Sequence, residues 1–214
     1  MNVNHHLTPD IIAAYSSGDL DEAYALVVAC HLSLCDQCRA DAMAYDALGG
    51  TVIEDMPEAE ISDDALEATL RLIEGAPPEP EPIRPKVGSM LPAPLQAYAG
   101  ADVSDISWRS LGGGVKQKLL KCGGESTARL LYIPGGKSVP DHGHRGLELT
   151  LVLQGSFSDH TARYARGDVE IGTEDLDHQP VADPGQDCIC LAATDAPLRF
   201  NSLIPKLIQP FARI

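Results

Sequence analysis

The segment GKSVPDHGHRGLELTLVLQG, residues 136–155, decides the fold that we expect for the second half of this chain. His142 and His144 alternate along an extended stretch, so both imidazoles point to one face of a strand. Glu148 begins the next strand, and His178 lies further along the chain and can complete the set. Three imidazoles and one carboxylate suit zinc, iron or manganese, and the ligand set alone does not choose among them.

Short stretches with strand character surround this segment, and glycine-rich turns separate them. We predict strands over residues 106–111, 115–122, 127–133, 148–153, 187–192 and 198–203. Many short antiparallel strands with such turns are typical of a sandwich or barrel, and we expect an antiparallel β-barrel. His160 lies outside the ligand spacing and is expected at the surface. Cys188 and Cys190 alternate on one strand face, where we favour core packing over a redox role.

A second ligand pattern lies near the N-terminus, where residues 31–38 read HLSLCDQC. On a helix, His31, Cys35 and Cys38 share one face because they are four and three residues apart. One imidazole and two thiolates form three-quarters of a tetrahedral zinc site, and His6 is the nearest upstream candidate for the fourth ligand. The alternative is two buried reduced cysteines beside a surface histidine. The histidine on the same face favours zinc.

The first 75 residues have helical patterns. We expect helices over about 9–17, 20–31, 41–48 and 63–74, and we expect Gly49-Gly50 to end the third. The fourth helix has an apolar stripe of Leu66, Leu70 and Ile73. This stripe packs either on the first three helices or on a partner, and the pattern favours the two equally.

Proline-rich residues 76–94 predict an extended linker without helix. We therefore predict an α+β protein of two domains, a small zinc-binding helical bundle over 1–85 and a β-barrel over 95–214. Residues 1–86 hold four basic and seventeen acidic residues, a net charge of −13, whereas residues 87–214 hold twelve and fourteen, a net charge of −2. An acidic helical module repels nucleic acid and attracts a basic protein surface.

The whole chain has 214 residues, and no apolar run approaches a membrane span. No secretion signal is recognisable at the N-terminus, so we expect a cytoplasmic protein without membrane contact. In that compartment the six cysteines favour metal binding or reduced thiols over disulfides.

Residues 136–155 resemble the first motif of the cupin superfamily position for position, through Gly136, His142, His144, Glu148 and Gly155. The second cupin motif is degraded. Ala165-Arg166-Gly167 stands where the superfamily has Pro-x-Gly, and His178 follows at a longer interval without the usual asparagine three residues later.

The N-terminal pattern resembles the signature of zinc-binding anti-sigma factors, and this resemblance favours His6 over His5 as the fourth ligand. An acidic helical zinc module, a proline-rich linker and a cupin in this order resemble the ChrR type of anti-sigma factor over nearly the whole chain. The resemblance implies that the helical domain binds and inhibits an extracytoplasmic-function sigma factor in a 1:1 complex. It also implies that the cupin serves release under oxidative stress, such as singlet oxygen, and that each domain holds a metal, with zinc as the expected ion.

Two other functions compete with this interpretation. A cupin metal with three histidines and one carboxylate also occurs in dioxygenases and isomerases, which would make the acidic domain an accessory. Arg145 and Tyr164 are the only candidates for a substrate clamp or base, and each is better explained as a surface or wall residue. A metal-storage role predicts loosely held zinc, whereas a closed site of two cysteines and two histidines predicts tight retention.

Overall fold

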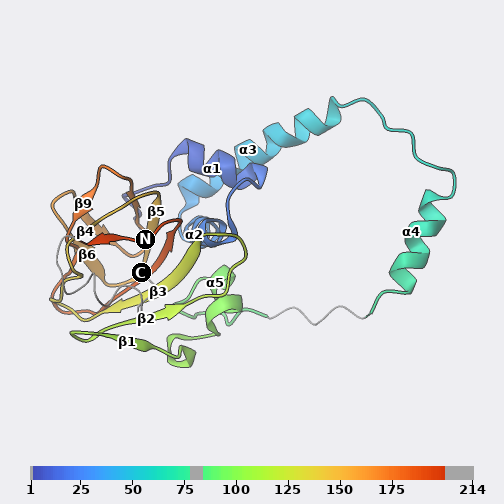
Figure 1. Ribbon diagram of the computed structural model, residues 1–214. Coiled ribbons are helices and arrows are strands. Elements are labelled where there is room, and N and C mark those ends of the chain that lie inside the picture. Colours follow the sequence, from blue (N-terminus) through green and yellow to red (C-terminus); the bar gives the residue numbers. More distant parts are fainter. Residues whose placement is uncertain (1, 78–83, 201–214) are drawn as a thin grey trace.

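The computed structural model describes residues 2–77 and 84–200, which fold into helices packed on antiparallel sheets (Figure 1). Its helices are α1 (Pro9–Ser17), α2 (Glu22–Leu32), α3 (Asp36–Glu54), α4 (Ala65–Glu74), α5 (Ala93–Ala99) and the short 3₁₀ helix η1 (Val103–Asp105). Its strands are β1 (Arg109–Gly112), β2 (Val115–Leu119), β3 (Thr127–Ile133), β4 (His142–Gly143), β5 (Glu148–Gln154), β6 (Ser156–Ser158), β7 (Arg163–Ala165), β8 (Val169–Gly172), β9 (Asp177–His178), β10 (Val181–Ala182), β11 (Cys188–Thr194) and β12 (Arg199–Phe200).

The strands form three antiparallel sheets. The largest has the order β1-β2-β3-β11-β5-β8, and the two smaller ones have the orders β10-β6-β7 and β12-β4-β9. Antiparallel pairing is as predicted, and in the described residues the three sheets are separate ladders without a closed sheet. The strand predicted over 198–203 begins as β12, and residues 201–203 lie outside the described part.

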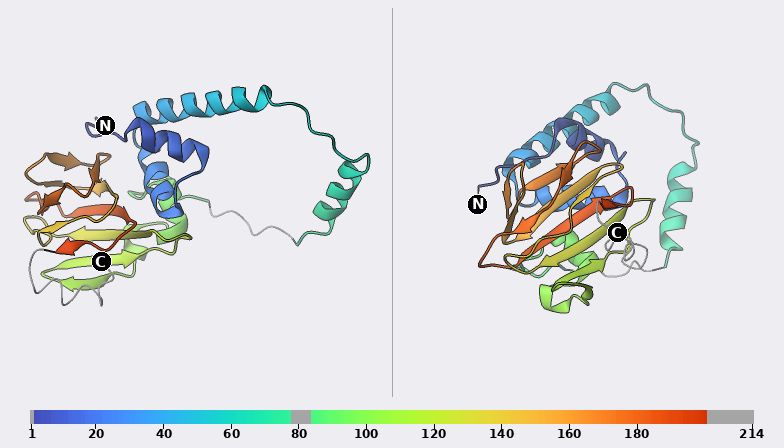
Figure 2. Two further views of the ribbon diagram at one scale, coloured as in Figure 1. Left: turned by 45° about the horizontal axis from the view of Figure 1, so that its top comes forward. Right: turned by 60° about the vertical axis from the view of Figure 1, so that its left-hand side comes forward.

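Helix α2 lies on one face of the six-stranded sheet, as both views in Figure 2 show. Its apolar side chains share a core with alternate residues of β5 and β11, such as Leu151 and Leu191. The other face of the sheet packs against Phe157 and Tyr164 of the smaller β10-β6-β7 sheet. Burial of apolar surface on both faces makes the six-stranded sheet the centre of the molecule.

The N-terminal helices therefore belong to the same core as the sheet. The fully buried Val27 and Cys30 of α2 lie in one cluster with Leu95 of α5 and Leu149 of β5. Helix α1 packs on α3, and both helix α1 and the sheet bury side chains against α2. The ligand residues predicted on these helices are thus held next to the sheet.

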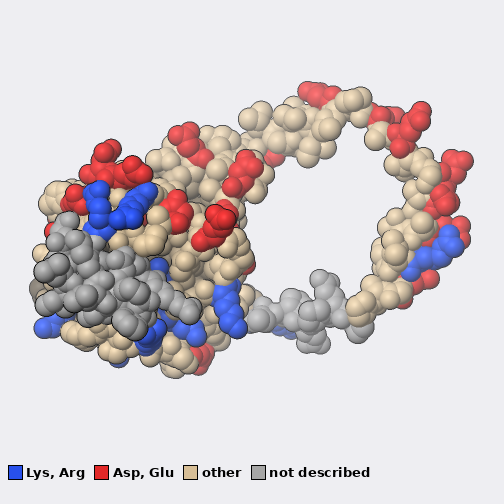
Figure 3. Space-filling view, viewed as in Figure 1, with Lys and Arg blue, Asp and Glu red and all other residues tan. Residues whose placement is uncertain are grey.

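A long arm, defined here as residues 46–77, departs from this core and contains the second half of α3 and all of α4 (Figure 1). None of the residues of α4 is buried, so its apolar stripe does not pack on the other described helices. Large apolar side chains are exposed along the arm: Leu48, Val52, Ile53, Met56, Ile61, Leu66, Leu70, Leu72 and Ile73. Acidic side chains accompany them, as Figure 3 shows.

Two expectations about helices were wrong. Helix α3 runs through Gly49-Gly50 to Glu54, because neither glycine adopts the left-handed conformation that ends a helix. The predicted absence of helix over 76–94 fails at Ala93, where α5 begins with Pro94 in its first turn. Proline at that position loses no hydrogen bond, since the first N–H groups of a helix have no partner within it.

No helix in the part of the chain that the structure describes combines the length and the apolar character needed to cross a membrane.

Candidate metal centres

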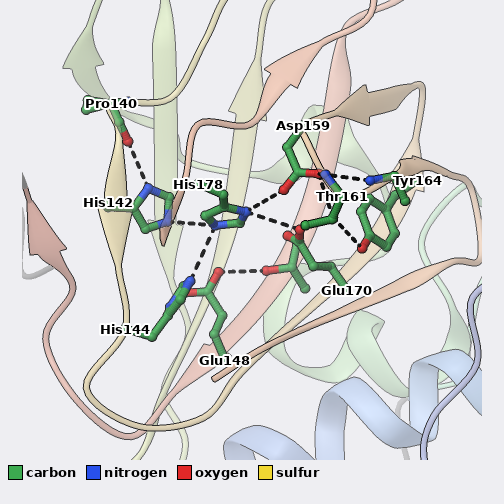
Figure 4. A network of polar contacts seen from close by, with 11 residues as sticks. Pro140, His142, His144, Glu148, Asp159, Thr161, Tyr164, Glu170 and His178 are labelled. Atoms are coloured by element: carbon green, nitrogen blue, oxygen red, sulfur yellow. Dashed lines mark hydrogen bonds and ion pairs between the residues drawn. The ribbon is translucent and has the colours of Figure 1, made fainter. Parts of the chain in front are cut away.

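The cupin centre is built from three strands and the loop that follows β4. His142 of β4 pairs in register with His178 of β9, and His144 lies two residues beyond His142. The Nε2 atom of His178 lies 3.3 Å from the Nε2 atoms of both His142 and His144 (Figure 4). All three side chains are buried. The structure thus brings together three of the four predicted ligands of this site.

This arrangement fits a metal ion. A neutral imidazole has one proton and one lone pair, so three converging Nε2 atoms cannot all be satisfied by hydrogen bonds to one another. Burial lowers the pKa of His142 and of His144, which keeps both rings neutral and able to coordinate. Such nitrogens would hold zinc, iron or manganese, which would supply Lewis acidity or redox chemistry.

Glu148, the fourth predicted ligand, begins β5 beside the three histidines. Its Oε2 atom lies 3.6 Å from Nδ1 of His144, and its Oε1 atom accepts a 2.9 Å hydrogen bond from the hydroxyl of Thr150. The carboxylate is therefore next to the three-nitrogen cluster but outside its tightest group.

Two buried carboxylates that sequence reasoning missed contact the far side of His178. Nδ1 of His178 lies 2.8 Å from Oδ2 of Asp159 and 3.2 Å from Oε1 of Glu170 (Figure 4). Burial opposes a charge on this ring, but the two carboxylates outweigh it and raise the pKa of His178 to about 9. They hold a proton on Nδ1, so a bound metal would replace the second proton on Nε2, which faces the other histidines.

Glu170 lies between the apolar residues Val169 and Ile171 in strand β8. This acidic residue in an apolar stretch was the available signal, but we did not predict a strand there. Asp159 lies in a turn, where its Oδ1 atom accepts hydrogen bonds from Thr161 and Ala162. Nothing in the spacing of the sequence places that turn near His178.

The N-terminal cluster consists of the four residues that the sequence predicted. One ligand atom from each of His6, His31, Cys35 and Cys38 lies within 4.8 Å of the others. Nδ1 of His6 is 3.3 Å from Sγ of Cys35 and 3.6 Å from Sγ of Cys38. Cys35 is the N-cap of α3, and its sulfur accepts the backbone N–H of Cys38 at 3.5 Å.

The chemistry of this cluster fits zinc. The Nε2 atom of His31 is buried and has no hydrogen-bond partner among the described residues, as expected for a metal ligand. Burial lowers the pKa of His31 to about 4 and raises that of the Cys38 thiol to about 11. A bound cation would supply the positive charge that a buried thiolate needs. His5 points elsewhere and contacts the ring of Tyr164, with ring centroids 4.5 Å apart and the rings tilted by 45°.

The turn between β7 and β8, residues 165–168, supports both histidines of the N-terminal cluster. Nδ1 of His31 lies 2.9 Å from the carbonyl oxygen of Gly167. Oδ1 of Asp168 accepts the backbone N–H groups of Asn4 at 2.6 Å and His5 at 3.0 Å. The N–H of Val169 donates to the carbonyl of His5 at 3.2 Å. The residues immediately before His6 are therefore fixed to the start of β8.

The remaining candidates behave as ordinary structural residues. His160 and Arg145 are exposed, as predicted. Tyr164 is buried and stacks on Phe157 with ring centroids 5.0 Å apart. Cys188 and Cys190 lie in the core with their sulfurs 3.4 Å apart.

Fold and site together define a cupin that has a metal-ligand cluster in its interior and a His/Cys cluster on the helices packed against it. Comparison with known proteins agrees with this class. Residues 96–197 match the family model described as the ChrR cupin-like domain. The chain is 54% identical over 214 residues, the full length of both proteins, to the anti-sigma-E factor ChrR of Cereibacter sphaeroides.

A solved structure is also similar. It is the crystal structure of Rhodobacter sphaeroides SigE in complex with the anti-sigma ChrR, with 50% identity and a TM-score of 0.80 over 91% of this chain and 100% of that one. The chain belongs to the ChrR family of anti-sigma factors. This is a family of regulatory proteins rather than enzymes.

Proposed function

We propose that this chain binds and inhibits an extracytoplasmic-function sigma factor in a 1:1 complex in the cytoplasm. The observation that carries the proposal is the full-length match to an anti-sigma factor, together with a solved relative in complex with its sigma factor. The exposed apolar and acidic arm supports it, because an amphipathic helix without a partner in its own fold is a common docking element. Its negative charge suits a basic partner.

The arm provides a direct test. Leu70→Ser together with Ile73→Ser removes two exposed apolar side chains from one face of α4 without touching the core. We expect at least a tenfold weaker affinity for the cognate sigma factor, measured by titration of the purified proteins. Ala68→Ser, on the opposite face of the same helix, is the matched control. Equal affinity of all three proteins would exclude α4 from the interface.

We further propose that the N-terminal cluster holds zinc as a structural ion and that the cupin centre holds a second metal, zinc or another divalent ion. Two thiolates and two imidazoles are typical of closed structural zinc sites. Loss of the metal from Cys35→Ser, with the cupin metal retained, would support this assignment. If neither the native protein nor the variant contained metal after purification without chelator, the assignment would be contradicted.

We also propose that the two predicted regions have different functions. Residues 1–85 would bind the sigma factor, and residues 95–214, with their sheets forming a cupin barrel, would govern its release under oxidative stress such as singlet oxygen. The turn at 165–168 and the strand β8 that follows it support a physical link. Glu170 of β8 contacts the cupin centre, while Gly167 and Asp168 of the turn hold the N-terminal cluster. A rearrangement of β8 would reach both centres.

The release step is testable on the reconstituted complex. A photosensitiser that generates singlet oxygen is expected to release sigma from the native protein and to leave it bound to His178→Ala. His160→Ala changes an exposed histidine and serves as the control. Equal release from all three proteins would remove the cupin centre from the response.

A further inference from the structure

Arg129 is a cationic residue buried inside the cupin sheets. It lies on β3 and is only 6% exposed. The strand register pairs Arg129 with Ala192 of β11, Ala192 with Thr150 of β5, and Thr150 with Glu170 of β8. Directly paired residues point to the same face of a sheet. Arg129 therefore faces the interior that also contains Glu170 and, two residues before Thr150, Glu148.

Two of the three guanidinium nitrogens of Arg129 have no hydrogen-bond partner in the described part of the chain. Its Nε and Nη1 atoms are buried without a hydrogen bond, and no carboxylate there approaches it within 4 Å. Burial lowers the pKa of Arg129, and the Glu148 carboxylate opposes this change from a longer distance. An arginine with five N–H donors is rarely left buried and unpaired, because the desolvation of its charge is then uncompensated.

The compensation from Glu148 would disappear when the cupin centre is loaded. The negative charge of a carboxylate that coordinates a divalent cation is neutralised by that cation and no longer stabilises a nearby guanidinium. Iron or manganese held by three imidazoles and one carboxylate keeps open positions for an exogenous ligand, and zinc can expand its coordination to admit one. Ala192 of β11 lies between Arg129 and Thr150 in the strand order. Its side chain is a methyl group, which has no polar atom to pair with the guanidinium.

The other charges in this interior limit what such a ligand can be. Asp159, Glu170 and Glu148 give it three acidic side chains, which Arg129 and a divalent cation in the loaded centre would bring close to neutral. A dianion such as phosphate would leave a larger excess of negative charge there than a monoanion. The planar fork of a guanidinium matches the two oxygens of a carboxylate.

We propose that Arg129 and the adjacent cupin centre form a binding site for a small molecule with a single carboxylate group. This inference rests on the proposed metal in the cupin centre. Arg129 would bind the carboxylate, and the rest of the ligand would lie toward His142, His144 and His178. It assigns to the cupin a ligand class and makes that ligand a candidate effector of sigma release.

Acetate is the probe for this site in the full-length protein loaded with Co²⁺. Both cobalt ions contribute d–d absorption, but only the N-terminal ion has thiolate-to-cobalt bands. A change in the d–d bands at constant thiolate-to-cobalt absorption therefore reports on ligand binding at the cupin centre. At constant ionic strength we expect acetate to change the d–d bands saturably and inorganic phosphate to bind at least tenfold more weakly. Arg129→Gln should weaken acetate binding at least tenfold, and Arg129→Lys should weaken it less, because a charge without the fork remains.

Arg109→Gln is the control, since Arg109 is exposed on β1 of the same sheet and should leave acetate binding unchanged. Equal acetate affinity in the native protein and Arg129→Gln would overturn the proposal, as would an absence of any saturable change. Phosphate binding as tight as acetate would overturn the carboxylate assignment. Metal analysis of each variant separates these results from failure of the metal site itself, because Arg129 is not a metal ligand and its variants should keep the cupin cobalt.

Discussion

The Nδ1 nitrogen of His31 donates to the carbonyl oxygen of Gly167 over 2.9 Å, across 136 positions of the chain. A neutral imidazole that donates through Nδ1 has its lone pair on Nε2, which is the atom that faces the cysteine cluster. The cupin part of the chain therefore selects the tautomer of a predicted zinc ligand in the N-terminal part. Such outer contacts orient metal ligands and tune their affinity.

Asp168 is the residue of this turn whose side chain can be changed most informatively. It is 1% exposed, and burial opposes its ionisation, but N–H donors from Ala165, Asn4 and His5 outweigh burial and lower its pKa. Asp168→Asn removes the charge that these donors share. We expect the segment before His6 to loosen and the zinc affinity of the N-terminal cluster to fall by about tenfold or more, measured by competition with a chromogenic chelator.

The matched control for Asp168→Asn is Asp183→Asn. Asp183 also accepts several hydrogen bonds, from Ser156, Ser158 and Arg163, and none of these residues belongs to the N-terminal cluster. It should leave the zinc affinity unchanged. Equal losses in the two variants would mean that general destabilisation, rather than the position of His6, sets the affinity.

The burial of His31 predicts a pH dependence of folding in the metal-stripped full-length protein. Its pKa is about 4 in the folded state, against about 6.5 in an unfolded chain. Between these values the unfolded chain binds a proton that the folded protein does not, so stability falls as the pH falls below about 6.5. From pH 7.5 to pH 5 this amounts to about 2 kcal/mol from His31 alone.

Urea unfolding of the native protein and of His31→Gln at both pH values measures this contribution as a difference between the two. The variant should lose less stability on acidification, whereas His160→Gln, at an exposed position, should behave as the native protein does. An unchanged pH dependence in His31→Gln would show that the ring is not buried in its neutral form.

Two pairs among the predicted ligands were predictable as neighbours because their spacing is local. His142 and His144 lie two residues apart on a strand, and Cys35 and Cys38 three apart near a helix start, so short-range geometry brings each pair together. The contacts around the ligands were not predictable in the same way. Asp159, Glu170 and the turn at 165–168 reach their histidines through sheet pairing between distant strands, for which the sequence has no local pattern.

The helices show the same limit. The apolar stripe of α4 was visible, but whether it was covered depended on tertiary packing, and in the described structure it is exposed. The apolar residues of α2 predicted a helix but not the sheet that lies against it. The start of α5 was not predicted from the proline-rich composition of residues 76–94. A proline in the first turn of a helix adds to that composition just as a proline in an extended segment does.

Gly49 and Gly50 provide a test of the arm. Both lie within α3, neither has a positive φ, and a Cβ at either position would meet no atom within 4 Å apart from the neighbouring backbone of the helix itself. Gly49→Ala and Gly50→Ala should therefore each stabilise this part of α3 by about 0.8–1 kcal/mol. Amide hydrogen exchange over residues 46–54 is expected to slow, with little change in the unfolding temperature because the arm lies outside the core.

Gly18→Ala is the contrasting substitution, since Gly18 ends α1 with φ of 78° and a side chain is strained there. It should lower the unfolding temperature rather than slow local exchange in the arm. Faster exchange over 46–54 in Gly49→Ala would show that α3 is not a continuous helix through the glycines.

The last prediction concerns Glu170, which lies on β8 between the two centres. Glu170→Gln weakens the contact that orients Nδ1 of His178, so the affinity of the cupin centre for its metal should fall by about tenfold to a hundredfold. Because Val169, the preceding residue, donates to the carbonyl of His5, a looser β8 should also speed zinc loss from the N-terminal cluster. Cobalt substitution reports on both centres in one sample: the thiolate-to-cobalt bands follow the N-terminal cluster, and the total cobalt content minus that share gives the cupin centre. Loss of cupin metal with an unchanged rate of loss at the thiolate site would show that the two centres are neighbours in the fold but independent in function.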